Sequence, residues 1–371
     1  MLEDEPLSLR DGIKLFESSV QLTGLVADRL RRRSAGDVVT FVIDRNINYT
    51  NVCISGCKFC AFYRSPASKD AYVLTQEELL EKVAEAVKLG ATQVLLQGGH
   101  HPELPFEYYE NMLRSMKEKF PRVQRHAFSP SEIAHIAKIS GSGIKETLKR
   151  LIEAGLQSIP GGGAEILDDK IRKKISPGKI DWKGWKKVMV TAHSLGIPTT
   201  ATMVYGLTEG YKERVRHLLR IRKIQEKTHG FTAFIPWSFQ PGNTALAREY
   251  KISDSSGIEY LKVVAASRIL LSGAIRNIQA SWVTQGANVA QVALSYGAND
   301  FGGTMIEENV VRAALVKAHA GTSTTKPSAG GLLSSGADSQ YLPPDEIVRL
   351  IKNAGRSAAQ RDTLYRILKR Y

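Results

Sequence analysis

The stretch FVIDRNINYTNVCISGCKFCAFYR, residues 41–64, holds all three cysteines of a chain of 371 residues. It begins with a short apolar and β-rich run, FVIDRNINYT at 41–50, which is typical of a β-strand. Cys53, Cys57 and Cys60 follow in the loop that leaves this run. A strand and the loop at its C-terminal end are therefore the features from which both fold and chemistry can be predicted.

Similar runs alternate with longer helical segments along the rest of the chain. The segment TQEELLEKVAEAVKLG at 75–90 has a capping residue at Thr75, a glutamate at the capping-box spacing at Glu78, and Gly90 to end the helix. Such alternation predicts repeated βα units and a parallel sheet. The eight candidate strands lie at residues 41–50, 92–99, 123–129, 156–162, 198–206, 231–237, 277–283 and 292–300.

Eight parallel strands with intervening helices predict an α/β fold, namely a (β/α)8 TIM-type barrel with an N-terminal helical extension and a C-terminal helical segment. We expect the extension at residues 1–40, the barrel core at 41–312, and at 313–371 a flexible stretch followed by a helix packed on the barrel. Residues 318–344 are rich in Gly, Ser, Thr, Ala and Pro, which indicates a flexible loop. The final helical segment is expected at 345–371.

In a barrel of this kind the active site is built by loops at the C-terminal ends of the strands. The cysteine loop directly follows the first candidate strand, and polar or glycine-rich residues follow other strands as well. Their convergence predicts the active site at this end of the barrel. The segments are QGGHHP (97–102), HAFSP (126–130), SIPGGGAE (158–165), VYGLTE (204–209), PWSFQPGNT (236–244) and SWVTQG (281–286).

The composition, 43% hydrophobic and 24% charged, is that of an ordinary globular protein and not of a disordered or fibrous one. The first thirty residues contain acidic residues and no continuous apolar core. They match neither a secretory signal nor a membrane span. The expected location is the cytoplasm.

The formal net charge of +14 raises the question of a nucleic-acid or membrane partner. The lysines and arginines are scattered along the sequence. The densest run, RLRRRSAG at 29–36, ends an amphipathic helix and lacks interleaved aromatic residues. We therefore expect neither nucleic acid nor a membrane as partner, and an attraction for small anionic substrates instead.

The three cysteines are spaced C-x3-C-x2-C. Their odd number, the expected cytoplasmic location and the short spacings disfavour disulfides. A zinc site is an alternative, but structural zinc takes four ligands and a histidine from elsewhere would have to complete it. The candidates for that ligand are His100, His101 and His126.

An iron–sulfur cluster fits the cysteines better, because soft thiolates select iron–sulfur chemistry. A cubane offers four iron corners, and an electron-transfer ferredoxin fills all four with cysteine. This chain has three cysteines to give, so one iron is left open. An open position distinguishes catalytic metal sites from closed structural ones.

The segment CISGCKFC at 53–60, with Phe59 in its aromatic position, resembles the signature of the radical S-adenosylmethionine superfamily. The resemblance implies a [4Fe-4S] cluster bound by Cys53, Cys57 and Cys60, with S-adenosyl-L-methionine chelated by the open iron. Reduction, by reduced ferredoxin or flavodoxin, then cleaves the sulfonium into methionine and a 5′-deoxyadenosyl radical.

Two further segments carry the same resemblance. LLQGGHHP at 95–102 is similar to the glycine-glycine motif of the superfamily, which implies that the backbone of Gly98 and Gly99 meets the amino group of S-adenosylmethionine. Where the superfamily usually has a glutamate after the glycines, this chain has His100. MVYGLTE at 203–209 resembles the segment that meets the adenine.

Several side chains near these motifs are candidates for contact with the cofactor. Phe59 and Tyr63 could cover S-adenosylmethionine, although aromatic residues also pack readily in loops. Glu165 could meet its ribose or amino group, or could simply be a charge at a helix N-terminus. The same two interpretations apply to Ser129, Ser158 and Arg172.

Longer strings resemble the dehypoxanthine futalosine cyclases of the futalosine route to menaquinone. The implied reaction removes hydrogen from C4′ of the substrate ribose, adds the carbon radical to the benzoate ring, and then loses a proton and an electron. Trp237 and Gln240 favour this family over the related aminofutalosine synthase. The strings are 44–64, 95–113, 155–167, 230–244, 278–286 and 359–367.

Alternatives remain open at this point. Among enzymes they are aminofutalosine synthase and a half of the deazaflavin-forming synthase, and from another class an iron–sulfur or zinc module without catalysis.

Trp237 and Trp282 line either the apolar ring pocket or the core. The reaction needs a proton acceptor, and histidine has an ordinary pKa of about 6.5 that suits this role. The candidates are His100, His101 and His126, among which the sequence does not choose.

Overall fold

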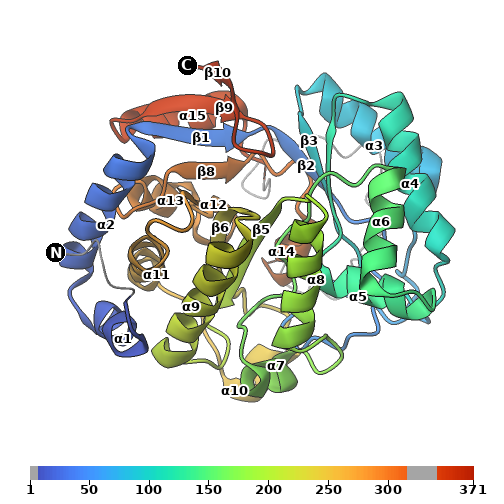
Figure 1. Ribbon diagram of the computed structural model, residues 1–371, viewed down its shortest axis with the longest axis horizontal. Coiled ribbons are helices and arrows are strands. Elements are labelled where there is room, and N and C mark those ends of the chain that lie inside the picture. Colours follow the sequence, from blue (N-terminus) through green and yellow to red (C-terminus); the bar gives the residue numbers. More distant parts are fainter. Residues whose placement is uncertain (1–6, 316–340) are drawn as a thin grey trace.

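The computed structural model describes residues 7–315 and 341–371. Strands and helices alternate along most of this part of the chain, as the sequence predicts (Figure 1). The predicted flexible loop at 318–344 lies for the most part outside the described residues. The strands are β1 (Val38–Val42), β2 (Asp44–Ile47), β3 (Gln93–Leu96), β4 (Gln124–Ala127), β5 (Thr199–Tyr205), β6 (Phe231–Ser238), β7 (Asn277–Ile278), β8 (Asp300–Gly303), β9 (Ser357–Arg361) and β10 (Ile367–Arg370).

Many of the helices begin where a side chain can bind the free N–H groups of the first turn. The Oγ1 of Thr75 accepts from the backbone N–H of Glu78 at 3.2 Å, and the carboxylate of Glu78 accepts from that of Thr75 at 2.8 Å, which confirms the predicted capping box. No helix in the described part of the chain has the length and apolar character needed to cross a bilayer. The helices are α1 (Leu9–Glu17), α2 (Val20–Ala35), α3 (Gln76–Lys88), α4 (Phe106–Lys119), α5 (Pro130–Ile139), α6 (Ile144–Ala154), α7 (Asp169–Ile175), α8 (Trp182–Ser194), α9 (Tyr211–Thr228), α10 (Ala245–Tyr250), α11 (Gly257–Leu270), α12 (Trp282–Gln285), α13 (Ala287–Ala293), α14 (Asn309–Leu315) and α15 (Pro344–Asn353).

The strands form three ladders, in the orders β10-β9-β1-β8, β2-β3-β4 and β5-β6-β7. Within the described residues the pairing is parallel except between β9 and β10. In the second ladder Asp44 pairs with Gln93, which in turn pairs with Gln124. Side chains from successive βα units therefore lie at the same level of the sheet.

Single parallel bridges continue the pairing from one ladder to the next. The predicted strand at 156–162 takes part in this way, without a ladder of its own. The strands thus follow one another around the molecule largely in chain order. The bridges join His126 to Ser158, Ile159 to Thr199, Gln279 to Asp300, and Arg45 to Ile306.

Two predicted strands were placed wrongly. The apolar run at 292–300 is the end of α13 and a turn, and β8 begins only at Asp300. Ala290 and Ala293, three residues apart, are both buried, which suits a helix face and not the alternation of a strand. The predicted strand at 277–283 is reduced to the two residues of β7, because α12 begins at Trp282.

The helical segment predicted at 345–371 is a helix only in its first part. Helix α15 ends at Asn353, and β9 then pairs in parallel with β1. Figure 1 shows this red C-terminal segment beside the blue strand β1. Without β9, one edge of β1 would leave its backbone N–H and C=O groups without ladder partners. At the other end, the helices predicted for 1–40 stop at Ala35, and β1 starts at Val38.

The core lies between the strands and the helices that cover them. Val94 and Leu96 of β3 are buried, and they belong to one apolar cluster with Leu79 of α3, Leu113 of α4 and Leu148 of α6. Helices α3, α4 and α6 therefore cover the outer face of the β2-β3-β4 ladder. The residues of β3 between these positions point to the other side, since successive side chains of a strand alternate.

Candidate active site

A cavity of about 250 Å³ lies on the inner face of the strands. Gln93, Leu95 and Gln97 line it, at every second position of β3 and its extension. Thr200 and Thr202 of β5 line it in the same alternation. The wall of this cavity is thus built by the strand side chains that do not enter the outer core.

A second cavity, of about 180 Å³, adjoins the first and is lined by the cysteine loop. All three cysteines line it, and Phe59, Cys60, Gln97 and Gly163 line both cavities. A group bound at the cysteines therefore borders directly on whatever occupies the larger cavity. The cysteine loop directly follows a strand in the sequence, which predicts that it lies next to the cavity between the strands.

Cys57 is buried, whereas Cys53 and Cys60 are partly exposed. Burial raises the pKa of Cys57 to about 12 and also raises the pKa of Cys60. In residues 7–315 and 341–371, no group of three or more His, Cys, Asp or Glu side chains is arranged to hold a single metal ion. Iron ligation requires thiolates, so binding must supply the free energy that removes these protons.

Gly98 and Gly99 lie against the cysteine loop. A Cβ atom on Gly99 would be 2.0 Å from the carbonyl oxygen of Val52 and 2.8 Å from Cβ of Cys53. On Gly98 it would be 2.5 Å from the ring of Tyr49. Both positions therefore require glycine because of a close approach that the sequence does not show.

Glu132 holds this glycine segment in place, and it was missed in the sequence. Its buried carboxylate accepts hydrogen bonds from the N–H of Gly98 at 2.9 Å, the N–H of Ser129 at 2.7 Å and the hydroxyl of Tyr49 at 2.7 Å. Burial raises the pKa of Glu132. The spacing S-x-x-E at 129–132 is a capping box that could have identified it.

Phe59, Tyr63 and Ser129, which were predicted to meet the cofactor, all line the smaller cavity. Ser129 also caps α5 through its side chain. Ser158 lies elsewhere: its hydroxyl is 2.7 Å from Nδ1 of His126, and it is absent from the described walls of both cavities. The structure thus brings three of these four candidates to the cysteine loop.

Glu165 and Arg172 lie in one buried ion-pair network with Lys179. Lys179 Nζ is 2.8 Å from Glu165 Oε1, and Arg172 Nη1 is 3.4 Å from Oε2. Burial opposes the charge of Lys179, but the nearby carboxylate of Glu165 outweighs it and raises the pKa of Lys179. Glu165 lines the larger cavity, whereas Arg172 binds the carbonyl groups of Gly163 and Ala164 and supports the loop.

The three candidate histidines occupy different surroundings. His100 lines the smaller cavity, its Nδ1 is 2.7 Å from Ser55 Oγ, and its ring stacks on His135. His101 is partly exposed and accepts from the N–H of Glu103. His126 lines the larger cavity. Burial lowers the pKa of both His100 and His126 to about 3, so both imidazoles are neutral near pH 7.

The two tryptophans have different positions. Trp237 lines the larger cavity together with Gln240, whose Nε2 donates to the carbonyl of Thr284 at 3.1 Å. Trp282 belongs to the apolar core, and its Nε1 donates to the carbonyl of Gly303 at 2.9 Å. Of the pair, Trp237 is therefore the one that faces the space where a ligand can bind.

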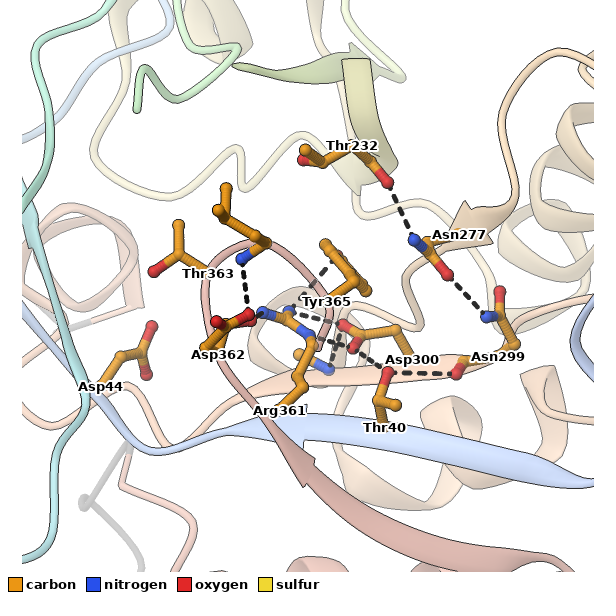
Figure 2. A network of polar contacts seen from close by, with 12 residues as sticks. Thr40, Asp44, Thr232, Asn277, Asn299, Asp300, Arg361, Asp362, Thr363 and Tyr365 are labelled. Carbon is orange, nitrogen blue, oxygen red and sulfur yellow. Dashed lines mark hydrogen bonds and ion pairs between the residues drawn. The ribbon is translucent and has the colours of Figure 1, made fainter. Parts of the chain in front are cut away.

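The C-terminal segment brings a polar network to the larger cavity, and sequence reasoning assigned it no role. Arg361 forms two hydrogen bonds with Asp300, and Thr40 donates to the same carboxylate at 2.6 Å (Figure 2). Arg361, Thr363 and Tyr365 all line the cavity. The sequence treats this segment as helix, so these side chains could not be placed.

Asp44 is the carboxylate that lines the cavity beside this network. Its Oδ1 accepts from the N–H of Met305 at 3.0 Å, and its Oδ2 from Nε2 of Gln93 at 3.5 Å. Burial raises the pKa of Asp44 to about 6. Within the strand sequence FVIDRN, a single acidic residue was the available signal, and it was not used.

Comparison with protein families gives two matches. The radical SAM superfamily matches residues 47–221, and the CofH/MqnC C-terminal region matches residues 228–329. Together these matches cover the cysteine loop, both cavities in large part, and the strands from β3 to β8.

Several relatives match along almost the whole chain, among them the following two. A cyclic dehypoxanthine futalosine synthase of Halalkalibacterium halodurans is 44% identical over 99% of this chain and 93% of its own. A 5-amino-6-(D-ribitylamino)uracil–L-tyrosine 4-hydroxyphenyl transferase of Methanocaldococcus jannaschii is 43% identical over 99% of this chain and 98% of its own. The two relatives have different names at nearly equal identity.

Among solved structures, methylornithine synthase (PylB) matches with a TM-score of 0.69 at 17% identity, over 96% of this chain and 95% of its own. The [FeFe]-hydrogenase maturase HydG matches with a TM-score of 0.67 at 15% identity, over 96% and 72%. These two structures show the fold alone. On the whole-chain relatives and the two family matches, the chain belongs to the radical S-adenosylmethionine superfamily and, within it, to the family that carries the CofH/MqnC C-terminal region.

Proposed function

We propose that this protein is a radical S-adenosylmethionine cyclase that converts dehypoxanthine futalosine to cyclic dehypoxanthine futalosine in menaquinone biosynthesis by the futalosine pathway. The relative at 44% identity bears the name of this activity. The structural observation that carries the proposal is the wall shared by the two cavities, formed by Phe59 and Cys60 among others. A substrate in the larger cavity borders directly on the cysteine loop.

The cofactors of this superfamily are a [4Fe-4S] cluster and S-adenosyl-L-methionine, and the residues present fit them. Cys53, Cys57 and Cys60 would hold the cluster, and the backbone of Gly98 and Gly99 comes close to the same loop. When bound and reduced, the cluster supplies homolytic cleavage of the sulfonium. Further cofactor contacts are proposed for Phe59, Tyr63, Ser129 and Glu165, which line the cavities.

The chain's own contribution is to hold the ribose and the ring together and to exclude water. Trp237, Ile235 and Leu95 give the larger cavity apolar surface for a ring, and Thr200 and Thr202 give it hydroxyl groups for a ribose. Holding two reacting groups in contact is the largest contribution that a protein can make to such a step. Reduced ferredoxin or flavodoxin is the proposed electron donor, and the cytoplasm the proposed location.

We also propose that the strands close into the (β/α)8 barrel that the sequence predicts. The support is the set of parallel ladders and bridges that joins each strand position to the next, including the bridge between Arg45 and Ile306. The division into an N-terminal extension at 1–40, a barrel at 41–312 and a C-terminal part at 313–371 is proposed with it.

A second candidate function is the 4-hydroxyphenyl transfer named in the relative at 43% identity, which is the reaction of a deazaflavin-synthase half. Its substrates, 5-amino-6-(D-ribitylamino)uracil and L-tyrosine, also combine a polar chain with a ring. Because the two relatives are almost equally similar to this chain, sequence identity does not separate the two activities. Offering the protein the substrates of each reaction does.

The test is anaerobic turnover of the reconstituted protein with S-adenosylmethionine and reductant, with the products identified by mass. The protein receives dehypoxanthine futalosine in one reaction, and 5-amino-6-(D-ribitylamino)uracil with L-tyrosine in another. We expect cyclic dehypoxanthine futalosine in the first reaction and no adduct in the second. An adduct in the second reaction alone would assign the transferase activity, and a Cys57→Ala variant controls for chemistry outside the site.

A further inference from the structure

The oxidative cyclisation needs a group that removes one proton from the ring after the new carbon–carbon bond has formed. Such a group must line the cavity that holds the ring and must have an unoccupied acceptor position. Three side chains in the described wall of the larger cavity are carboxylates or imidazoles, the groups that most often accept protons in enzymes: Asp44, His126 and Glu165. Their hydrogen bonds and ion pairs show which of the three is best placed to accept the proton.

Asp44 is held firmly on the inner face of β2. A Cβ atom on Gly303 of β8 would be 2.1 Å from Asp44 Oδ1, so the carboxylate rests directly on the backbone of the neighbouring strand. The N–H of Met305 fixes Oδ1 at 3.0 Å. The carboxylate is therefore oriented by main-chain atoms, and its second oxygen is the one left for a ligand.

The second oxygen, Oδ2, has a single long hydrogen bond among the described residues, from Nε2 of Gln93 at 3.5 Å. Gln93 is itself oriented, because its Oε1 accepts from the hydroxyl of Thr363 at 2.6 Å. A carboxylate oxygen accepts two hydrogen bonds readily. Asp44 Oδ2 thus retains acceptor capacity at the surface of the cavity.

Among the described residues, no cation lies at bonding distance from the carboxylate of Asp44. Arg361 of β9 is the nearby cation, and it is engaged in two hydrogen bonds with Asp300 of β8 (Figure 2). The carboxylates of Asp300 and Glu308 oppose the charge of Asp44, whereas Arg361 favours it. Burial is the largest effect and raises the pKa of Asp44 to about 6. A base with a pKa in this range is suited to proton transfer near neutral pH.

The two rivals are less suited to the role. Glu165 is paired with Lys179 and Arg172, which stabilise its negative charge. Nδ1 of His126 shares a hydrogen bond with Oγ of Ser158, and burial together with Arg361 lowers the pKa of His126 to about 3. His100 and His101, predicted alternatives, are absent from the described wall of the larger cavity.

We propose that Asp44 is the catalytic proton acceptor of the cyclisation, a role that rests on the proposed function. After the ribose carbon radical has added to the ring, the C–H bond at the newly saturated ring carbon breaks. Its proton passes to Asp44 Oδ2, and the ring regains its aromatic electrons. The one remaining electron leaves to a one-electron acceptor of the iron–sulfur class.

The test compares wild-type holoenzyme with Asp44→Asn, which keeps the shape of the side chain and the acceptor for Met305 but cannot take up the proton. We expect the variant to form 5′-deoxyadenosine while cyclic product falls by about 100-fold or more. The matched control is Asp254→Asn, the same exchange at an exposed residue that lines neither cavity. Its ratio of cyclic product to 5′-deoxyadenosine should stay within about twofold of wild type. Cluster content and melting temperature show whether each variant is folded.

Wild-type enzyme gives a second measurement that needs no variant. The ratio of cyclic product to 5′-deoxyadenosine should fall as the pH drops through about 6, where Asp44 becomes protonated. An Asp44→Asn variant with wild-type product ratio, or a wild-type ratio that is flat across this pH range, overturns the role of Asp44 while the proposed function stands. If wild-type enzyme forms no cyclic product, the proposed function itself fails.

Discussion

The guanidinium group of Arg361 donates two hydrogen bonds to the carboxylate of Asp300, at 2.6 and 3.0 Å, from positions 61 residues apart in the chain. Both side chains are buried, and the ring of Tyr365 lies 3.9 Å from the guanidinium carbon of Arg361. This pair fixes β9 to β8 on either side of β1. It also places the C-terminal segment at the wall of the larger cavity.

Removing one partner of this buried pair should destabilise the protein strongly. We expect Arg361→Leu to lower the free energy of unfolding by about 3 to 5 kcal/mol, because it leaves Asp300 charged and without its partner. Chemical denaturation measures this change. Arg349→Ala removes an exposed partner of Glu346 on α15 and should leave the unfolding midpoint almost unchanged. Equal effects of the two substitutions would contradict the assignment.

Gly99→Ala should disturb the cysteine loop. The added methyl group would meet the carbonyl of Val52 and Cβ of Cys53, so the loop must move. We expect cluster affinity to fall by about 10- to 100-fold, as for other groups that orient metal ligands. Iron and sulfide content after anaerobic reconstitution measures this loss. Gly143→Ala is the control, because a Cβ atom there meets open space.

Asp44→Asn should also change how stability depends on pH. The folded pKa of about 6 lies above the ordinary aspartate pKa of 3.8, so the folded protein favours the protonated carboxyl, and ionised Asp44 destabilises the fold increasingly as pH rises. The effect is at most about 3 kcal/mol above pH 6. We therefore expect the melting temperature of the variant to exceed that of wild type by a margin that grows from pH 4 to about pH 7. A margin that shrinks over this range would show that Asp44 is stabilised as the anion.

Lys179→Met should lower the reduction potential of the cluster. Lys179 carries a positive charge that interacts with Cys57, and a cation near the cluster favours the reduced, more negative state. Its loss should shift the midpoint by on the order of 1 kcal/mol, or about 40 mV for one electron. An anaerobic redox titration followed by electron paramagnetic resonance measures the shift. Lys58→Met is the control, since Lys58 in the same loop is exposed and paired with Glu249.

Local features of the molecule were predictable from the sequence. The strand before the cysteines, the capped helix α3 and the placement of the cysteine loop depend on residues close together in the chain. The family match confirms the superfamily that the spacing of the cysteines indicates. Hydrogen bonds at helix ends and the alternation of side chains along a strand are local properties, which is why a sequence records them.

The roles of Phe59, Tyr63, Ser129 and Glu165 stay predictions, although the structure places all four at cavity walls. Ser158, Arg172 and His101 were named on the same kind of sequence reasoning, and they lie outside the described cavity walls. The side chain of a residue beside a motif can point into the cavity or away from it. Which direction it takes depends on neighbours that are distant in sequence.

The sequence by itself determined that three thiols share one loop after a strand, and that glycines follow the next strand. Only the tertiary structure decided that Ser357–Arg361 is a strand, because its ladder partner β1 lies more than 300 residues earlier. It also decided that Asp44 is a buried carboxyl group with a raised pKa, since the pKa of a carboxyl group depends on the solvent it has lost and on charges brought near by folding. The strand that pairs with a segment and the burial of a side chain both depend on residues distant in the sequence. The neighbouring residues therefore do not reveal them.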